Sequence, residues 1–231
     1  MFSTLLFDLD GTLVNTDSVH FLSWQKILRR YNLNIDIDFF NQYISGKHNP
    51  DIVKTILPQL SSAESQAIIR EKEADYRNLI ADKIEPLPGL HEFLAWAKSL
   101  NFKLGLVTNA PRLNVNLLIN SLGLNDTFDV MIIGEDLPLT KPHPFPYQEA
   151  LNQLGVNNSE ACSRGEILRV AFEDSPAGVM SAVGAGITTV GVLSSHSSDT
   201  LLKLGVNWVI EDFRDANLER LGYSWRGKIK N

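Results

Sequence analysis

The stretch LLFDLDGTLVNTD, residues 5–17, places Asp8 and Asp10 one residue apart, directly after an apolar run. In an extended strand, side chains two residues apart lie on the same face, so these two carboxylates can converge. Two like charges that close repel each other unless one carboxyl keeps a proton or a cation lies nearby, and both arrangements occur in catalysis. Taken alone, the stretch fits equally well a strand that runs into a polar Asp10-Gly11 turn.

The composition indicates an ordinary folded protein of a reducing compartment. The chain has 231 residues, 44% of them hydrophobic, which is enough for a core that needs no covalent staples. A single cysteine, Cys162, rules out an intramolecular disulfide. The sequence begins without a basic leader and has no apolar run of membrane-spanning length. We therefore expect a cytoplasmic protein with no membrane partner.

The charge pattern argues against nucleic acid as a partner. The formal net charge is -6, and the lysines and arginines are scattered along the chain. Nucleic-acid binding needs clustered positive charge, so we expect none. An anionic substrate would need local positive charge, from a cation or from a few well-placed lysines.

Residues 16–84 have the apolar spacing of helices throughout. The ranges predicted as helical are 17–33, 36–44, 48–57 and 61–84. We expect Asn49 to cap the third of these helices, with Pro50 at its first position. The fourth begins with a capping box that starts at Ser61 or Ser62.

Beyond a short linker at residues 85–89, apolar strands alternate with helices. The predicted strands are 103–109, 129–134, 168–174, 187–192 and 208–210, and the predicted helices are 89–100, 112–124, 144–155, 176–186 and 199–205. Such alternation predicts an α/β fold, a doubly wound parallel sheet that also contains the N-terminal strand. We expect a core domain of residues 1–15 and 85–231, with residues 16–84 inserted after the first strand as a small all-helical domain.

Polar side chains follow several of these strands. Thr108 and Asn109 end one strand, Glu173 and Asp174 end another, and Lys141 lies in the loop after a third. Each group alone is also compatible with a helix cap or a surface turn. However, the carboxyl ends of parallel strands share one edge of the sheet, where ligands bind in such folds. We therefore expect all these groups to share one cleft with the opening aspartate pair.

This order of motifs resembles the haloacid dehalogenase superfamily of phosphohydrolases. The shared elements are D-x-D-G-T, a strand ending in Thr, Lys-Pro, and E-D-S, and the resemblance covers nearly the whole chain. The helical insert looks like the small cap of that superfamily, and the remainder like its Rossmann-like core. Residues 141–151, KPHPFPYQEAL, and 172–178, FEDSPAG, look most like the branch that holds beta-phosphoglucomutase and small sugar phosphatases.

The resemblance implies a role for each of the core motifs. Asp8 would be the nucleophile that forms an aspartyl-phosphate, and Asp10 the general acid and base. Thr108, with Asn109 nearby, would hydrogen-bond the phosphoryl oxygens. Lys141 would bridge the charges of Asp8 and the phosphate.

The resemblance also implies Mg2+ as cofactor. Its ligands would be a side-chain oxygen of Asp8, the backbone carbonyl of Asp10 and the side chain of Asp174. Glu173 would be a direct or water-mediated partner. Such hard oxygen ligands suit Mg2+. The metal, together with Lys141, would relieve the repulsion between the two opening aspartates.

A polar break interrupts the helical cap at Gly46, Lys47, His48 and Asn49. We expect these four residues to form a substrate-binding loop over the site, with Trp24 and His20 nearby. The alternative is a simple turn between two helices.

Some neighbouring activities are disfavoured by single residues. Halide-displacing members of the superfamily lack the acid/base aspartate that is present here as Asp10. Phosphonoacetaldehyde hydrolases use a cap lysine as a Schiff base, and Lys47, Lys54 and Lys72 are the candidates. We expect these lysines to be solvated surface charges instead.

The choice between hydrolase and mutase is left open by the cap. In beta-phosphoglucomutase, basic residues of the cap hold a bisphosphate, whereas here Ser45 precedes Gly46 and Asn49 stands where an arginine would fall. His20 and Lys72 do resemble positions of the mutase cap.

We expect a Mg2+-dependent phosphatase that hydrolyses a small phosphorylated metabolite, a sugar or polyol phosphate, through an aspartyl-phosphate. The alternatives are a beta-phosphoglucomutase-type isomerase and a non-enzymatic protein that binds a phosphorylated metabolite. We expect a monomer or weak homodimer, and we assign no role to residues 156–167.

Overall fold

The computed structural model describes residues 4–80, 84–156 and 168–225, so that Cys162 and most of the segment 156–167 lie outside the described residues. Within the described ranges, six parallel strands form one sheet in the order β3-β2-β1-β4-β5-β6. The strands are β1 (Thr4–Phe7), β2 (Lys103–Thr108), β3 (Val130–Ile133), β4 (Arg169–Glu173), β5 (Thr188–Val192) and β6 (Trp208–Ile210). The predicted doubly wound sheet is confirmed.

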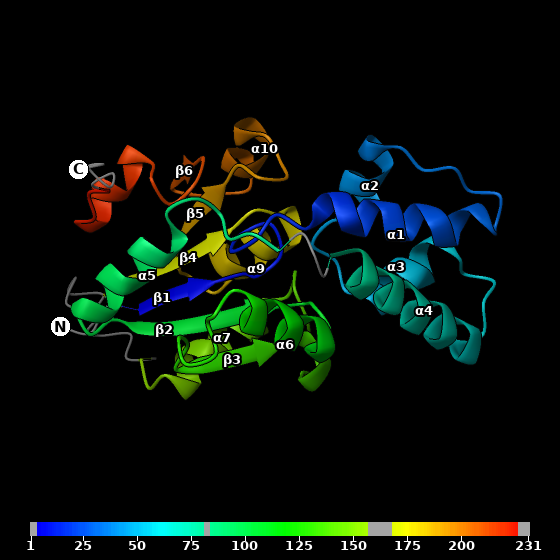
Figure 1. Ribbon diagram of the computed structural model, residues 1–231, viewed down its shortest axis with the longest axis horizontal. Coiled ribbons are helices and arrows are strands. Elements are labelled where there is room, and N and C mark those ends of the chain that lie inside the picture. Colours follow the sequence, from blue (N-terminus) through cyan, green and yellow to red (C-terminus); the bar gives the residue numbers. More distant parts are fainter. Residues whose placement is uncertain (1–3, 81–83, 157–167, 226–231) are drawn as a thin grey trace.

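Helices cover both faces of this sheet (Figure 1). One face packs against α5 (Leu90–Ser99), α6 (Arg112–Ser121) and the 3-10 helix η2 (Ala216–Leu221), and the other against α7 (Phe145–Gln153) and α9 (Pro176–Gly184). Two shorter elements are η1 (Gly134–Asp136) and α10 (Ser198–Lys203). In β1, Leu5 and Phe7 point to the first face and Leu6 to the second. A strand buried on both faces needs an unbroken apolar run, which is what β1 has.

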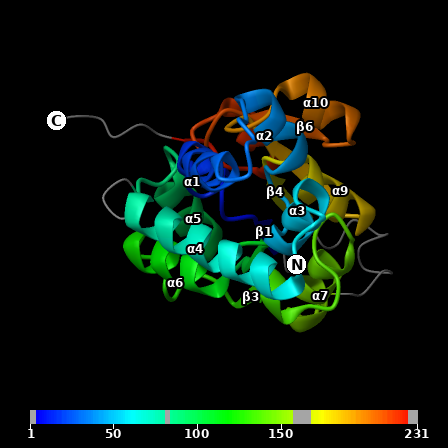
Figure 2. The same ribbon diagram turned by 90° about the vertical axis from the view of Figure 1, so that its right-hand side faces the viewer.

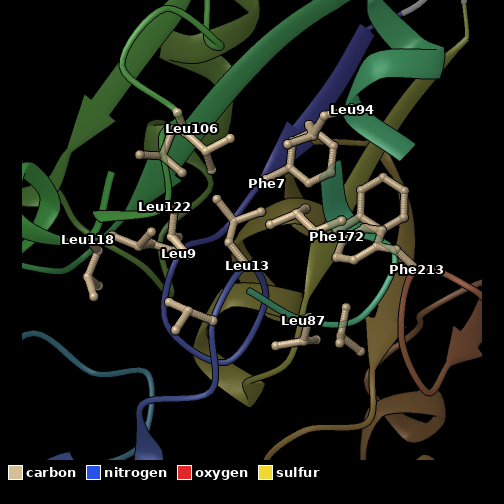
Figure 3. Packing of buried hydrophobic residues seen from close by; sticks show 14 of the residues in the cluster. Phe7, Leu9, Leu13, Leu87, Leu94, Leu106, Leu118, Leu122, Phe172 and Phe213 are labelled. Carbon is tan, nitrogen blue, oxygen red and sulfur yellow. The ribbon is translucent and has the colours of Figure 1, made fainter. Parts of the chain in front are cut away.

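An aromatic cluster lies directly beneath the ends of β1 and β4 (Figure 3). The rings of Phe7 and Phe172 are stacked with centroids 4.9 Å apart, and Phe93 and Phe213 pack against both. Aromatic pairs of this kind contribute about 0.5–1.5 kcal/mol each beyond their burial. Because Asp8 directly follows Phe7 and Glu173 directly follows Phe172, this cluster fixes the positions of both carboxylates.

Four helices between β1 and α5 form the predicted all-helical cap, which is confirmed. They are α1 (Asp17–Arg29), α2 (Ile37–Tyr43), α3 (Asn49–Ile56) and α4 (Ser62–Ile80). They enclose a hydrophobic cluster of their own that includes Trp24, Leu28, Phe40, Ile52 and Val53. Seen from the cap side, these helices lie in front of the sheet and its strand ends (Figure 2).

The first residues of α3 and α4 test the predicted N-terminal capping residues. The capping box at Ser61 is confirmed, since its N–H and hydroxyl donate to the Glu64 carboxylate at 2.8 and 2.6 Å. The predicted cap at Asn49 is wrong by one residue, because α3 begins at Asn49 and His48 precedes it with extended backbone. The Asn49 side chain binds Glu73 instead. No helix in the described part of the chain combines the length and the apolar character needed to cross a membrane.

Candidate active site

A cavity of about 70 Å3 lies between the carboxyl edge of the sheet and the cap. The predicted site residues that line it are Asp8, Asp10, Thr108, Asn109, Lys141 and Asp174 from the core, and His20, Gly46, Lys47 and Asn49 from the cap. Since one water needs about 10–15 Å3 by the same measure, the cavity holds only a few water molecules. A larger ligand therefore requires the cap and the core to move apart.

Lys141 is fixed at the centre of the site. Its Nζ lies 2.6 Å from Oδ1 of Asp8, 2.6 Å from Oε1 of Glu173 and 2.6 Å from the carbonyl oxygen of Val107. These three acceptors satisfy the three protons of the ammonium group. Burial would lower the pKa of Lys141, but the charges of Asp8 and Glu173 outweigh it and raise the pKa. Lys141 is therefore held as a cation.

The carboxylates around Lys141 carry more negative charge than one lysine can offset. Burial is the largest cause that raises the pKa of Asp8 to about 8, and the charge of Glu173 adds to it while Lys141 opposes it. Burial, with the charges of Asp8 and Asp17, raises the pKa of Asp174 well above its usual value. A further cation at this point would return both groups to the ionised form.

The acidic cluster fits a hard divalent cation. Oxygens of Asp8, Glu173 and Asp174 lie within 4.8 Å of one another, and all three residues are buried. Oε2 of Glu173 is buried and has no hydrogen bond to any described residue. Oxygen-only donors with an orphaned carboxylate oxygen match the preferences of Mg2+ or Ca2+.

Gly11 explains how the chain passes so close to this cluster. Its φ is +80°, and a Cβ at this position would lie 2.0 Å from Oδ2 of Asp174. Only glycine adopts this conformation without strain and leaves space for the carboxylate. The hydroxyl of Thr12 lies 3.4 Å from the other oxygen of Asp174.

Asp10 is turned towards the cap. Its Oδ1 accepts hydrogen bonds from Thr16 at 2.5 Å and Tyr76 at 3.3 Å, and lies 3.3 Å from Nε2 of His20. Burial would raise the pKa of Asp10, but the hydrogen bond and charge of His20, with the bond from Thr16, lower it. β1 ends at Phe7, so strand alternation does not place Asp10 beside Asp8. The turn after the strand brings both to the cavity.

Lys72 is the clearest departure from the predictions, because it is 1% exposed rather than solvated. Its Nζ lies 2.7 Å from Oε1 of Glu73 and 2.7 Å from Nδ1 of His20, between the rings of Trp24 and Tyr76 at 5.4 Å. The buried Glu73 carboxylate compensates its charge.

Two acidic residues that line the cavity, Asp17 and Glu73, were not selected from the sequence, whereas Trp24, expected beside the cap loop, does line it. The spacing of residues in the sequence does mark a buried face of α4. Ile68, Lys72, Tyr76 and Ile80 follow one another at intervals of four, so they share one helix face. That spacing places Lys72 among buried side chains.

Asn109 ties the Lys141 loop to the cap. Its Nδ2 donates to the carbonyl oxygens of Lys141 at 3.1 Å and Gly46 at 3.3 Å, and its Oδ1 accepts from the backbone N–H of Lys141. Beside it, the hydroxyl of Thr108 accepts from the backbone N–H of Ala110 at 3.0 Å. The two residues border the space next to Asp8.

The predicted cap loop reaches the core through Gly46. A Cβ on Gly46, whose φ is +69°, would lie 2.3 Å from the hydroxyl oxygen of Ser175. Lys47 borders the cavity, but its Nζ donates to the carbonyl of Gln42 at 2.7 Å. His48 is not among the residues that line the described cavity. The loop therefore brings Gly46, Lys47 and Asn49, but not His48, to the site.

Comparisons with known proteins agree with this geometry. The family model of haloacid dehalogenase-like hydrolases matches residues 5–192. The validoxylamine A 7'-phosphate phosphatase of Streptomyces hygroscopicus subsp. limoneus is 26% identical, over 97% of this chain and 100% of its own. The beta-phosphoglucomutase of Bacillus subtilis (strain 168) is 29% identical, over 96% of this chain and 94% of its own. The crystal structure of beta-phosphoglucomutase from Clostridium difficile has a TM-score of 0.81 at 27% identity and covers 96% of each chain. The chain therefore belongs to the haloacid dehalogenase-like hydrolase family.

Proposed function

We propose that this protein is a Mg2+-dependent phosphatase that hydrolyses a sugar or polyol phosphate through an aspartyl-phosphate on Asp8. The observation that supports this most strongly is Lys141, held 2.6 Å from both Asp8 and Glu173 in the cavity between the core and the cap. One similar protein is named a phosphatase of a phosphorylated metabolite. A buried nucleophile beside a fixed cation suits attack on a phosphoryl group.

In the first step, an oxygen of Asp8 forms a bond to phosphorus while the bond to the leaving oxygen breaks. Asp10 gives a proton to that oxygen from its protonated form, which is the minor form because the pKa of Asp10 is lowered. In the second step, Asp10 takes a proton from water, which attacks phosphorus and releases phosphate from Asp8. Oδ1 of Asp10 is occupied by hydrogen bonds, so we assign the proton transfers to Oδ2. Thr108 and Asn109, together with Lys141, would bind the phosphoryl oxygens.

We propose that Asp8, Asp174 and the backbone carbonyl of Asp10 hold Mg2+, with Glu173 as a direct or water-mediated partner. When bound, the ion supplies positive charge that offsets the phosphoryl group and favours the ionised form of Asp8. The orphaned oxygen of Glu173 and the raised pKa of Asp8 support this assignment.

We further propose that residues 16–84 act as a cap domain over the core of residues 1–15 and 85–231. His20, Gly46, Lys47 and Asn49 would contact the part of the substrate that lies away from the phosphate, since they line the cavity from the cap. By covering the strand ends, the cap would limit the access of bulk water during the reaction.

A beta-phosphoglucomutase-type isomerase is the second candidate. The contact between His20 and Lys72 favours it, since these positions resemble the mutase cap and two similar proteins have that name. The two candidates differ in their product, which makes them separable.

The test is phosphate release from a panel of sugar, polyol and glycolate phosphates with Mg2+. In parallel, glucose 6-phosphate formation from beta-glucose 1-phosphate is followed. Asp8→Asn is the inactive control, and Asp199→Asn is the matched control, because Asp199 is exposed on α10. Free phosphate that depends on Asp8 supports the hydrolase. Glucose 6-phosphate without free phosphate supports the mutase, and inactivity in both assays contradicts both candidates.

A further inference from the structure

The cap end of the cavity contains a buried ion pair between two consecutive residues of α4. Nζ of Lys72 lies 2.7 Å from Oε1 of Glu73, and the two side chains are 1% and 5% exposed. Both residues line the cavity from the cap helix α4. The pair is neutral as a whole, so Lys72 offers no surplus positive charge.

The other cationic side chains of the cavity are also occupied. Lys47 donates to a backbone carbonyl of α2, and Lys141 is enclosed by Asp8 and Glu173. Against these three lysines, five carboxylates line the cavity: Asp8, Asp10, Asp17, Glu73 and Asp174. At the core end, one bound divalent cation and Lys141 would offset the charges of three carboxylates, Asp8, Glu173 and Asp174, and a phosphoryl group would add further negative charge. Among the described residues, the cap end therefore keeps only the charge of Lys47, whose Nζ is turned to the carbonyl of Gln42.

Glu73 is held in the ionised form by its partners. Oε1 accepts from Lys72 and from Asn49 at 2.8 Å, and Oε2 accepts from Asn114 at 2.5 Å. Burial would raise the pKa of Glu73, but the charges of Lys72 and His20 and the hydrogen bonds from Lys72 and Asn114 lower it. An ionised carboxylate only accepts hydrogen bonds, so it attracts hydroxyl groups and repels phosphate.

We infer that Glu73, with Asn49 and Lys72, selects monophosphates whose far end is neutral and carries hydroxyl groups, and rejects bisphosphates and diphosphates. A substrate hydroxyl can donate to Glu73 and accept the remaining proton of Lys72. A second phosphate would lie against a buried carboxylate, and the cation beside it, Lys72, is already paired. The inference rests on the proposed function and names the substrate class of that same site.

The inference also bears on the isomerase alternative. A mutase of this kind has to hold a bisphosphate against its cap. The ion pair between Lys72 and Glu73 therefore favours a hydrolase over a mutase.

The experiment compares matched probes on one sample of protein with Mg2+. Initial rates of phosphate release give kcat/KM for fructose 1-phosphate and fructose 1,6-bisphosphate, and for ribulose 5-phosphate and ribulose 1,5-bisphosphate. The proteins are the native chain, Glu73→Gln and the control Glu71→Gln. Glu71 lies on the same helix, but its side chain is 51% exposed and pairs with Arg30. Both substitutions remove one negative charge, at buried and exposed positions respectively.

We expect the native protein to prefer each monophosphate over its bisphosphate by about tenfold or more. In Glu73→Gln this ratio falls by about tenfold, because Lys72 becomes available to a second phosphate. Glu71→Gln keeps the native ratio. A partly unfolded variant lowers both rates equally, so the ratio is unaffected. If Glu73→Gln does not fold, Asn49→Lys adds a positive charge at the same end and is expected to lower the ratio.

Hydrolysis of both kinds of probe with a ratio that neither substitution moves would overturn the inference and leave the proposed function standing. A native preference for bisphosphates would overturn it equally. A native protein that hydrolyses none of the probes in an Asp8-dependent manner would overturn the proposed function, and the inference with it.

Discussion

Nδ2 of Asn114 on α6 donates a hydrogen bond of 2.5 Å to Oε2 of Glu73 on α4, which joins the core to the cap at a buried point. Oδ1 of Asn114 accepts a second bond from Arg77 of the cap at 2.9 Å. One core side chain therefore holds two cap residues. This contact stabilises the arrangement in which the cap closes the cavity.

Replacement of Asn114 by Ala should weaken that closed arrangement. The substitution leaves the buried Glu73 with one hydrogen bond fewer, so we expect the free energy of unfolding to fall by about 1–3 kcal/mol. Urea unfolding measures the change. The matched control is Asn116→Ala, since Asn116 is exposed on the same helix. An equal loss in both variants would contradict a specific role of the Asn114 contact.

The contribution of Glu73 to stability should depend on pH. The pKa of Glu73 is lower in the folded protein than in the unfolded chain, where it is about 4.3. Glu73 therefore stabilises the fold above the unfolded pKa, and this stabilisation is lost as the pH falls through the folded pKa. We expect the native protein to be more stable than Glu73→Gln at pH 7, with a smaller difference below about pH 4. Urea unfolding of both proteins between about pH 4 and pH 7 measures this difference in the free energy of unfolding. A difference that stays constant or grows on acidification would contradict the assignment.

Lys141→Met should abolish most of the activity. Without the ammonium, Asp8 and Glu173 face each other unscreened, so the pKa of Asp8 rises further and less of the nucleophile is ionised. We expect phosphate release to slow by about 100- to 1,000-fold. Lys203→Met, at an exposed position of α10, should retain native rates. Native rates in Lys141→Met would contradict the central role of this lysine.

Mg2+ should raise the melting temperature through the acidic cluster. At about 100 times its Kd, the ion should stabilise the fold by about 2.7 kcal/mol, which corresponds to roughly 5–10 °C for a chain of this size. Thermal unfolding with and without Mg2+ measures the shift. We expect Asp174→Asn to remove the shift and the exposed Asp199→Asn to keep it. Equal shifts in both variants would place the ion elsewhere.

The sheet and the strand-end residues could be predicted from sequence because the rules that govern them are local. Apolar runs gave all six strands of the described chain, and the common edge of a parallel sheet brought Thr108, Lys141 and Asp174 to the same cavity as Asp8. Each of these residues lies at or after the end of a strand, so its position follows from the topology alone.

The polar network of the cap could not be predicted in the same way. Glu73 and Asn114 are 41 residues apart and meet only when α4 packs on α6, so no local pattern marks their contact. Lys72 was expected in solvent because a lysine is usually exposed, although its four-residue spacing from Tyr76 marks the buried face. The orientation of His48 depends on where α3 begins, and helix boundaries are the least certain part of a sequence pattern.

The most direct test of the central claim is to look for the phosphoryl group on Asp8 during turnover. The protein is mixed with Mg2+ and the best monophosphate of the panel, quenched in acid, digested and analysed by mass spectrometry. We predict a phosphorylated peptide that contains Asp8 in the native protein, and no such peptide and no phosphate release in Asp8→Asn. Steady phosphate release that survives Asp8→Asn, with no phosphorylated peptide at this position, would contradict the claim.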